Sequence, residues 1–189
     1  QIKLPPPLED RDFHLYCSPH NLGASQLGEE LSKLIQSSNP GKNGALLMTS
    51  DPDKLRSCDY MLVYLTSSTW TSGSSSEQYA GDVLAALQAG VALLLVHEFP
   101  SAIDENSERQ ACEFDMFWKD GWTPKHLLLG EFNIYRTIAI PLKVGAWRRP
   151  GLIQVALKLA NGGPPRQPVK GKPEAHHKSS LRRSRWLSK

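Results

Sequence analysis

Two pairs of residues in this sequence have side chains that could act on a substrate. His97 and Glu98 follow an apolar run one after the other, and an imidazole beside a carboxylate can bind a ribose or accept a proton. Cys17 and His20 lie close enough in sequence to serve as a thiol and its base. Each pair has a structural alternative, because strand exits are commonly polar and a cysteine beside a proline turn is commonly a buried core residue. We favour the structural alternative for both pairs.

A third candidate is the serine run Ser74–Ser76 with Glu77, which opens a predicted helix. Free amides at a helix N-terminus can hold a phosphate, but a serine there is more often the helix cap. The sequence shows no glycine fingerprint of a dinucleotide fold, no Walker loop and no cysteine and histidine spacing typical of a metal site. We therefore expect neither a metal nor a bound cofactor.

A parallel sheet would position these residues. Two nearly continuous apolar runs over 60–65 and 91–96 are joined by a predicted helix over 77–89, which is typical of neighbouring parallel strands with a crossover. Other predicted strands cover 12–17, 45–49 and 134–142, and other predicted helices cover 23–37, 51–55, 109–118 and 150–160. The sequence thus predicts an α/β fold with a single small doubly wound parallel sheet of about five strands and flanking helices. In such folds, functional side chains lie at the carboxyl ends of the strands.

The length of 189 residues, of which 40% are hydrophobic, suits one core rather than two. Composition divides the chain into a proline-rich extended lead-in over 1–11, a domain over 12–162 and a basic, proline-rich tail over 163–189. We expect order to begin at Asp12. No apolar run is long enough to span a membrane.

The charge of the chain is unevenly distributed. The tail over 163–189 has eight basic residues and one acidic residue, a net charge of +7, so the remainder carries −4 of the total of +3. A basic tail of this kind binds nucleic acid or an acidic surface. Its end combines cations with an aromatic ring, which suits phosphate contacts plus a stacked base, through Arg182, Arg183, Arg185 and Trp186.

A second candidate interface lies before the last predicted helix, where Trp147 is followed by Arg148 and Arg149. Tryptophan and arginine are enriched at the energetic centres of protein interfaces. The cysteines, Cys17, Cys58 and Cys112, are odd in number and lie in or beside predicted core elements, which favours reduced thiols. We therefore expect an intracellular protein, in the cytoplasm or an organelle interior.

Three segments resemble the Toll/interleukin-1 receptor (TIR) domain, a small flavodoxin-like fold. Asp12-Phe13-His14-Leu15-Tyr16-Cys17-Ser18 is similar to the first strand of that family. The segment over 55–67 is similar to its polar helix end, buried strand and Thr/Ser exit, and the segment over 79–87 is similar to the following helix. The resemblance covers most of residues 12–160.

The resemblance also implies a site. TIR enzymes that cleave NAD carry a glutamate on the helix after the third strand, and Asp82 stands at that position here. Aspartate is one methylene shorter, and an offset of about 1 Å in a catalytic group costs on the order of a hundredfold in rate. If the chain were such an enzyme, NAD would be its substrate, and Ser18 and Ser67 at the strand exits would line the pocket.

We expect a non-catalytic TIR-like interaction or structural module within a larger protein or multisubunit complex, with tails that contact neighbouring proteins. Two alternatives stay open. One is an NAD-cleaving hydrolase that uses Asp82, and the other is an RNA-associated subunit anchored by the basic tail.

Overall fold

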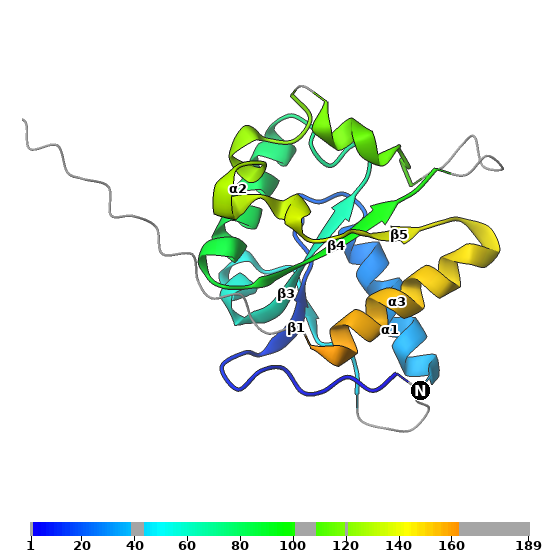
Figure 1. The fold of residues 1–189 in the computed structure, drawn as a ribbon. Coiled ribbons are helices and arrows are strands. Elements are labelled where there is room, and N and C mark those ends of the chain that lie inside the picture. The colour runs from blue at the N-terminus through cyan, green and yellow to red at the C-terminus, as the bar shows by residue number, and fades with distance from the viewer. Residues whose placement is uncertain (1, 39–43, 101–108, 120, 163–189) are drawn as a thin grey trace, which may run out of the picture.

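The computed structural model describes residues 2–38, 44–100, 109–119 and 121–162. Five strands and three α-helices form the regular structure of this part (Figure 1). The strands are β1 (Phe13–Tyr16), β2 (Met48–Thr49), β3 (Cys58–Leu65), β4 (Ala92–Glu98) and β5 (Ile140–Leu142). The helices are α1 (Ala24–Ser38), α2 (Ser74–Gln88) and α3 (Arg148–Asn161). The tail over 163–189, with the predicted interface residues Arg182, Arg183, Arg185 and Trp186, lies outside the described residues.

The strands form one sheet in the order β2-β1-β3-β4-β5, and every pairing in it is parallel. This is the flavodoxin-like order, in which the direction of winding reverses between β1 and β3. The central pair, β3 and β4, is in register from Tyr60 opposite Ala92 to Leu65 opposite His97. The predicted fold class, a five-stranded doubly wound parallel sheet with flanking helices, is confirmed.

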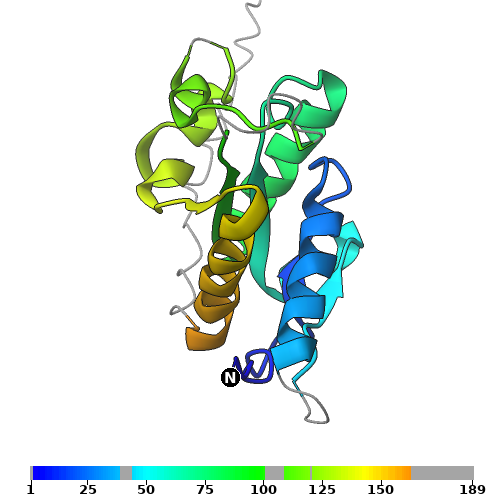
Figure 2. The ribbon, with the colours of Figure 1, turned by 90° about the vertical axis from the view of Figure 1, so that its right-hand side faces the viewer.

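Helices cover both faces of the sheet. α1 and α3 lie side by side on one face, and α2 covers the other (Figure 2). Alternate residues of β3 therefore enter different cores: Leu62 and Tyr64 face α1 and α3, whereas Met61 and Val63 face α2. Because both faces are covered, β3 is apolar from Tyr60 to Leu65 rather than alternating, which explains the continuous apolar run in the sequence.

The core between the sheet and helices α1 and α3 follows from helical spacing. Leu27, Leu31 and Ile35 recur every four residues of α1 and are fully buried against the sheet. Burial of each such side chain contributes about 1.5–3 kcal/mol to stability. At the other side of this core, Gly151 lets α3 approach the sheet, since a Cβ there would lie 2.9 Å from the carbonyl oxygen of Pro141.

The proline-rich lead-in is part of the folded domain. Ile2 and Leu4 are buried in the core beneath α1 and α3. The ring Nε2 of His14 lies 2.8 Å from the carbonyl oxygen of Pro5, and the backbone N–H of Leu8 donates to a carboxylate oxygen of Asp59 at 3.2 Å. Order therefore begins well before Asp12, because Ile2 and Leu4, which precede the prolines, are buried in this core.

The chain between β4 and α3 differs from the prediction. In place of a helix over 109–118, only Phe114–Trp118 forms a short 3-10 helix. Gln110 has a φ of 53°, which ends any helix, and its carbonyl oxygen accepts the N–H of Ser67 at the end of β3. The strand predicted over 134–142 is reduced to β5, since Ile134–Arg136 forms another 3-10 helix.

All three cysteines lie within the described residues, and each is a free thiol. In the described ranges, no helix combines the length and the apolar character that crossing a bilayer requires.

Candidate functional site

His97 and Glu98, adjacent at the end of β4, lie on opposite faces of the sheet. The ring of His97 packs among Phe99, Phe114 and Phe117, with centroid distances of 5.2 to 5.8 Å. Its Nε2 lies 2.8 Å from the carbonyl oxygen of Cys112. Burial lowers the pKa of His97, although the hydrogen bond to Cys112 opposes the shift. His97 thus serves to hold the segment after β4 against the sheet.

The lowered pKa of His97 predicts a loss of stability in acid. Below its ordinary pKa of about 6.5, the unfolded chain takes up a proton that the folded chain excludes, so the free energy of unfolding should fall between pH 7 and pH 5. Urea melts at several pH values would measure the slope. His97→Gln should reduce it, whereas His126→Gln, at an exposed position, should leave it unchanged. An equal slope in all three proteins would contradict this role of His97.

Ser18 and Asp82 are brought together by the fold. The hydroxyl of Ser18, just after β1, donates to a carboxylate oxygen of Asp82 on α2 at 2.7 Å. The hydroxyl of Tyr16 is buried on the same face, and its pKa is raised by burial and by the charge of Asp82. Ser67 lies on the loop after β3, where its backbone contacts Gln110 and Thr71. The structure thus pairs two of the predicted residues and leaves Ser67 apart from them.

The remaining candidates have structural roles. Burial raises the pKa of Cys17 to about 12, so its thiol stays protonated and is no nucleophile at neutral pH. The N-cap of α2 is Gly73 rather than a serine, and the hydroxyl of Ser76 donates to the carbonyl oxygen of Thr69 instead. The described residues include no group of three histidine, cysteine or carboxylate side chains that could hold a metal.

Glu98 is the centre of a buried charge network. Its carboxylate is fully buried and accepts a hydrogen bond from the hydroxyl of Tyr64 at 2.6 Å. Nη1 of Arg148, the first residue of α3, donates to both carboxylate oxygens of Glu98 at 2.9 and 3.0 Å. The same guanidinium binds Glu30 of α1 through Nε at 2.7 Å and Nη2 at 3.2 Å. Arg148 therefore ties α1, β4 and α3 together.

Electrostatics fix the protonation states in this network. Burial alone would lower the pKa of Arg148, but the hydrogen bonds and charges of Glu30 and Glu98 outweigh it and raise the pKa. Burial and the neighbouring charge of Glu98 raise the pKa of Tyr64, so its hydroxyl remains a donor. With a side chain only 12% exposed, Arg148 is directed into the domain, while the predicted interface residues on either side of it are exposed.

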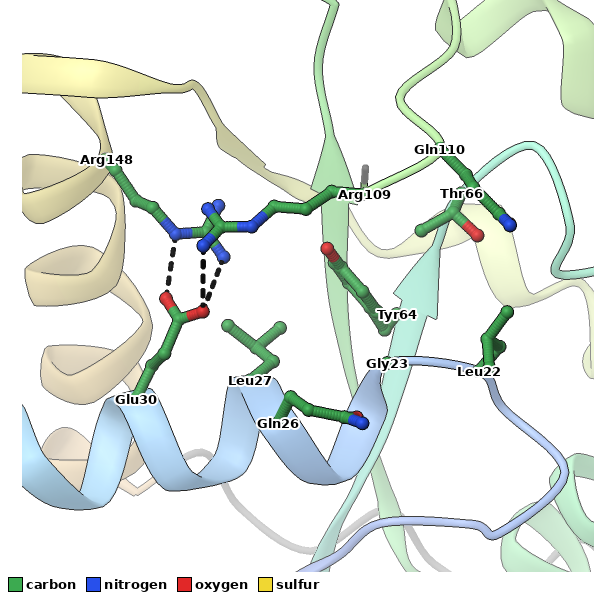
Figure 3. Close-up of a pocket in the computed structure, with 10 residues that line it drawn as sticks. All are labelled: Leu22, Gly23, Gln26, Leu27, Glu30, Tyr64, Thr66, Arg109, Gln110 and Arg148. Atoms are coloured by element: carbon green, nitrogen blue, oxygen red, sulfur yellow. Dashed lines mark hydrogen bonds and ion pairs between the residues drawn. The ribbon is translucent and has the colours of Figure 1, made fainter. Parts of the chain in front are cut away.

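A cavity of about 380 Å³ opens beside this network (Figure 3). It lies at the carboxyl end of β3, next to the turn between β1 and α1, which is where the winding of the sheet reverses and where ligands of such folds bind. Figure 3 shows Arg109 and Arg148 reaching Glu30 from different directions. The cavity is lined by Leu22, Gly23, Gln26, Leu27, Glu30, Tyr64, Thr66, Arg109, Gln110 and Arg148.

Sequence reasoning found Glu98 and Arg148 but missed Glu30, Tyr64 and Arg109. A buried tyrosine in β3 gives no sign of its partner, and Glu30 reads as an ordinary polar position of an amphipathic helix. The one available signal is the strand register: Tyr64 is opposite Val96, and Glu98, two residues further along β4, lies on the same face as Val96.

A second hollow lies at the edge of the sheet, between β5 and the start of α3. Its volume is about 240 Å³, and we call it the Trp147 groove, lined by Pro141, Lys143, Trp147, Pro150, Gly151 and Gln154. The side chain of Trp147 is 71% exposed. Among the described aromatic side chains Trp147 is the most exposed, and a large apolar side chain left open to solvent beside a hollow is typical of an interaction site.

Comparisons of the chain with protein-family models, with curated proteins and with solved structures found no significant match. The geometry of the molecule therefore carries the functional argument.

Proposed function

We propose that this chain is a non-catalytic, TIR-like interaction module of a larger intracellular protein or multisubunit complex. We further propose that it binds an acidic surface of a partner protein through the Trp147 groove. The observation that carries this proposal is the exposed indole of Trp147 in a groove between β5 and α3. A tryptophan supplies a large contact area at little cost in conformational entropy, and truncated interface tryptophans often cost 2 kcal/mol or more.

The charge around the Trp147 groove indicates the chemistry of the partner. Lys143 lines the groove and is exposed, Arg149 is an exposed cation next to the lining residue Pro150 in sequence, and no acidic residue occurs between Glu131 and Glu174 in the sequence. Lys143 is the charged residue of the groove lining, and a positively charged surface attracts an acidic partner and accelerates its association. The tail over 163–189 is basic in sequence, so its cations would also attract an acidic partner.

The edge of the sheet favours contact through side chains rather than through an added strand. β5 is the outermost strand and has three residues, and its central residue is Pro141. Proline has no N–H to donate, so a partner strand cannot pair along this edge.

The TIR-like part of the proposal is supported by the positions of two elements. β3 and α2 occupy the segments whose sequences resemble that family.

Loss of the indole should separate this function from the alternatives. We expect Trp147→Ala in the full chain to lose a set of acidic partner proteins during affinity purification from the cells that make it, with affinity reduced roughly thirtyfold or more. Trp118→Ala is the matched control, because Trp118 is 48% exposed and packs on Tyr135, and neither residue lines the groove. Quantitative mass spectrometry of the companions, with and without ribonuclease, gives the readout. If both variants keep the same companions, the groove is not the interface; if the companions disappear with ribonuclease, the basic tail is an RNA anchor.

NAD cleavage through Asp82 is the rival from another class. The contact between Ser18 and Asp82 favours it, since it places a hydroxyl and a carboxylate together after β1. Asp82 does not line the cavity at the end of β3, however, and it is already hydrogen-bonded. We expect the purified chain to leave NAD intact. Consumption of NAD that Asp82→Asn abolishes without changing the melting temperature would overturn our proposal.

A further inference from the structure

We propose that the cavity at the carboxyl end of β3 binds a small zwitterion, an α-amino acid with an apolar side chain. In this site Arg109 takes the carboxylate and Glu30 takes the ammonium group. The inference concerns a surface other than the Trp147 groove and does not depend on it. A volume of about 380 Å³ falls within the range of small-molecule pockets, about 300–1,000 Å³.

The two arginines of the cavity differ in how many of their N–H donors are free to bind a ligand. Arg148 uses Nε, Nη1 and Nη2 in bonds to Glu30 and Glu98, and its side chain is 12% exposed. Arg109 has a single long contact within the described residues, from Nη2 to Glu30 at 3.3 Å, and its side chain is 40% exposed. A guanidinium has five N–H donors in a planar fork that matches a carboxylate. Arg109 is thus the cation that can bind a ligand, whereas the donors of Arg148 hold Glu30 and Glu98 in place.

Glu30 is the matching anion. Its two oxygens accept three hydrogen bonds from Arg109 and Arg148, and its side chain stays 30% exposed on the cavity wall. A carboxylate has about four acceptor positions, so Glu30 can accept one more N–H. The amide side chain of Gln26, one turn earlier on α1, lies on the same wall and offers a further oxygen to an ammonium group.

The charge balance favours a zwitterion over an anion. Arg109 and Arg148 are balanced by Glu30 on the cavity wall and by Glu98 behind it. A ligand with a net charge would leave one charge uncompensated in a partly enclosed site, which is costly. A zwitterion adds no net charge, and its two poles match the separated positive and negative groups.

Part of the remaining wall is apolar, beside the polar side chains of Thr66 and Gln110. Leu22, Leu27 and the ring of Tyr64 supply the apolar part of the lining. Leu22 is 60% exposed at the rim, so an apolar ligand side chain would cover it. Gly23 makes this wall possible: its φ is +84°, and a Cβ there would lie 2.8 Å from the Tyr64 ring. The turn between β1 and α1 can therefore rest directly on that ring.

The first test compares three molecules that differ only in their poles. Thermal shift and isothermal titration of the full chain would use leucine, leucinamide, which lacks the carboxylate, and 4-methylpentanoate, which lacks the ammonium group. We expect leucine or another apolar α-amino acid of a complete panel to raise the melting temperature, and both analogues to bind at least tenfold more weakly. Equal binding of 4-methylpentanoate would make the site a plain anion site and overturn the zwitterion. Failure of every amino acid in the panel at millimolar concentration would overturn the ligand site itself.

Variants would then locate the bound ligand. Arg109→Gln should weaken binding at least tenfold and shift it toward leucinamide, since only the carboxylate contact is lost. Leu22→Ser should weaken binding of leucine more than that of glycine, because it alters only the apolar rim. Arg136→Gln, at an exposed cation that does not line the cavity, is the matched control. Binding that survives Arg109→Gln at full strength contradicts the proposal, whatever the outcome for Trp147.

Discussion

Arg148→Met should lower the free energy of unfolding by about 3–5 kcal/mol. The substitution leaves the fully buried carboxylate of Glu98 with the hydroxyl of Tyr64 alone, and it also removes both bonds from Arg148 to Glu30. Removal of one partner from a buried ion pair is costly because the remaining charge keeps its desolvation penalty without its compensation. Equilibrium urea denaturation followed by circular dichroism would measure the change.

Two companion variants test the cause of that loss. Arg149→Met changes the next residue, which is exposed and takes no part in the network of Glu30, Glu98 and Arg148, so it should alter stability by no more than about 0.5 kcal/mol. Glu98→Gln combined with Arg148→Met should recover part of the loss, since the uncompensated charge is then absent. A double variant as unstable as the sum of its parts would show that packing, and not charge, makes Arg148 important.

Phe117→Ala should cost about 3–5 kcal/mol. Phe117 is fully buried on the α2 face of the sheet, with ring centroids of His97 and Phe114 at 5.4 and 5.6 Å. Its loss opens a cavity at the place where the irregular chain between β4 and β5 is held to the sheet. Chemical denaturation would give the total loss, and hydrogen exchange should show faster opening of residues 112–136 than of β3.

The control for Phe117 is Leu129→Ala. Leu129 belongs to the same irregular segment but is 67% exposed, so we expect a change within about 0.5 kcal/mol. Phe117→Leu should fall between the two, because it keeps an apolar side chain while removing ring contacts. A small effect of Phe117→Ala would mean that this segment contributes little to the stability of the sheet.

The central part of the fold could be predicted because its signals are local. The apolar runs of β3 and β4 are long, and Gly90 separates α2 from β4 in sequence and in structure. The chain after β4 could not be predicted in this way. The aromatic residues around Phe117 have helical spacing, yet the backbone of Gln110 and Cys112 bonds to the strand ends and prevents a helix.

The candidate site shows a different limit. Glu98 stands out in sequence as a polar strand exit, and Arg148 as a cation beside an exposed tryptophan. Their partnership is tertiary, since Arg148 is 50 residues from Glu98 and 118 residues from Glu30. Sequence spacing carries no information about contacts at such separations. Arg148, which we expected at a surface, therefore proves to bind Glu30 and Glu98 within the domain. The exposure of Trp147, by contrast, follows from its place in a short turn before α3.

The same separations have a consequence for the order in which the protein assembles. A ribosome produces α1, the sheet strands β1 to β4 and their apolar cores before it adds Arg148, and the carboxylate of Glu98 resists burial until that cation arrives. We therefore expect the nascent chain to leave the face shared by α1 and α3 open until Arg148 has been made, although that face is apolar. On this expectation α3, the last helix of the described residues, completes the domain, and a chain released before α3 is made would expose the apolar core that α1 and α3 share.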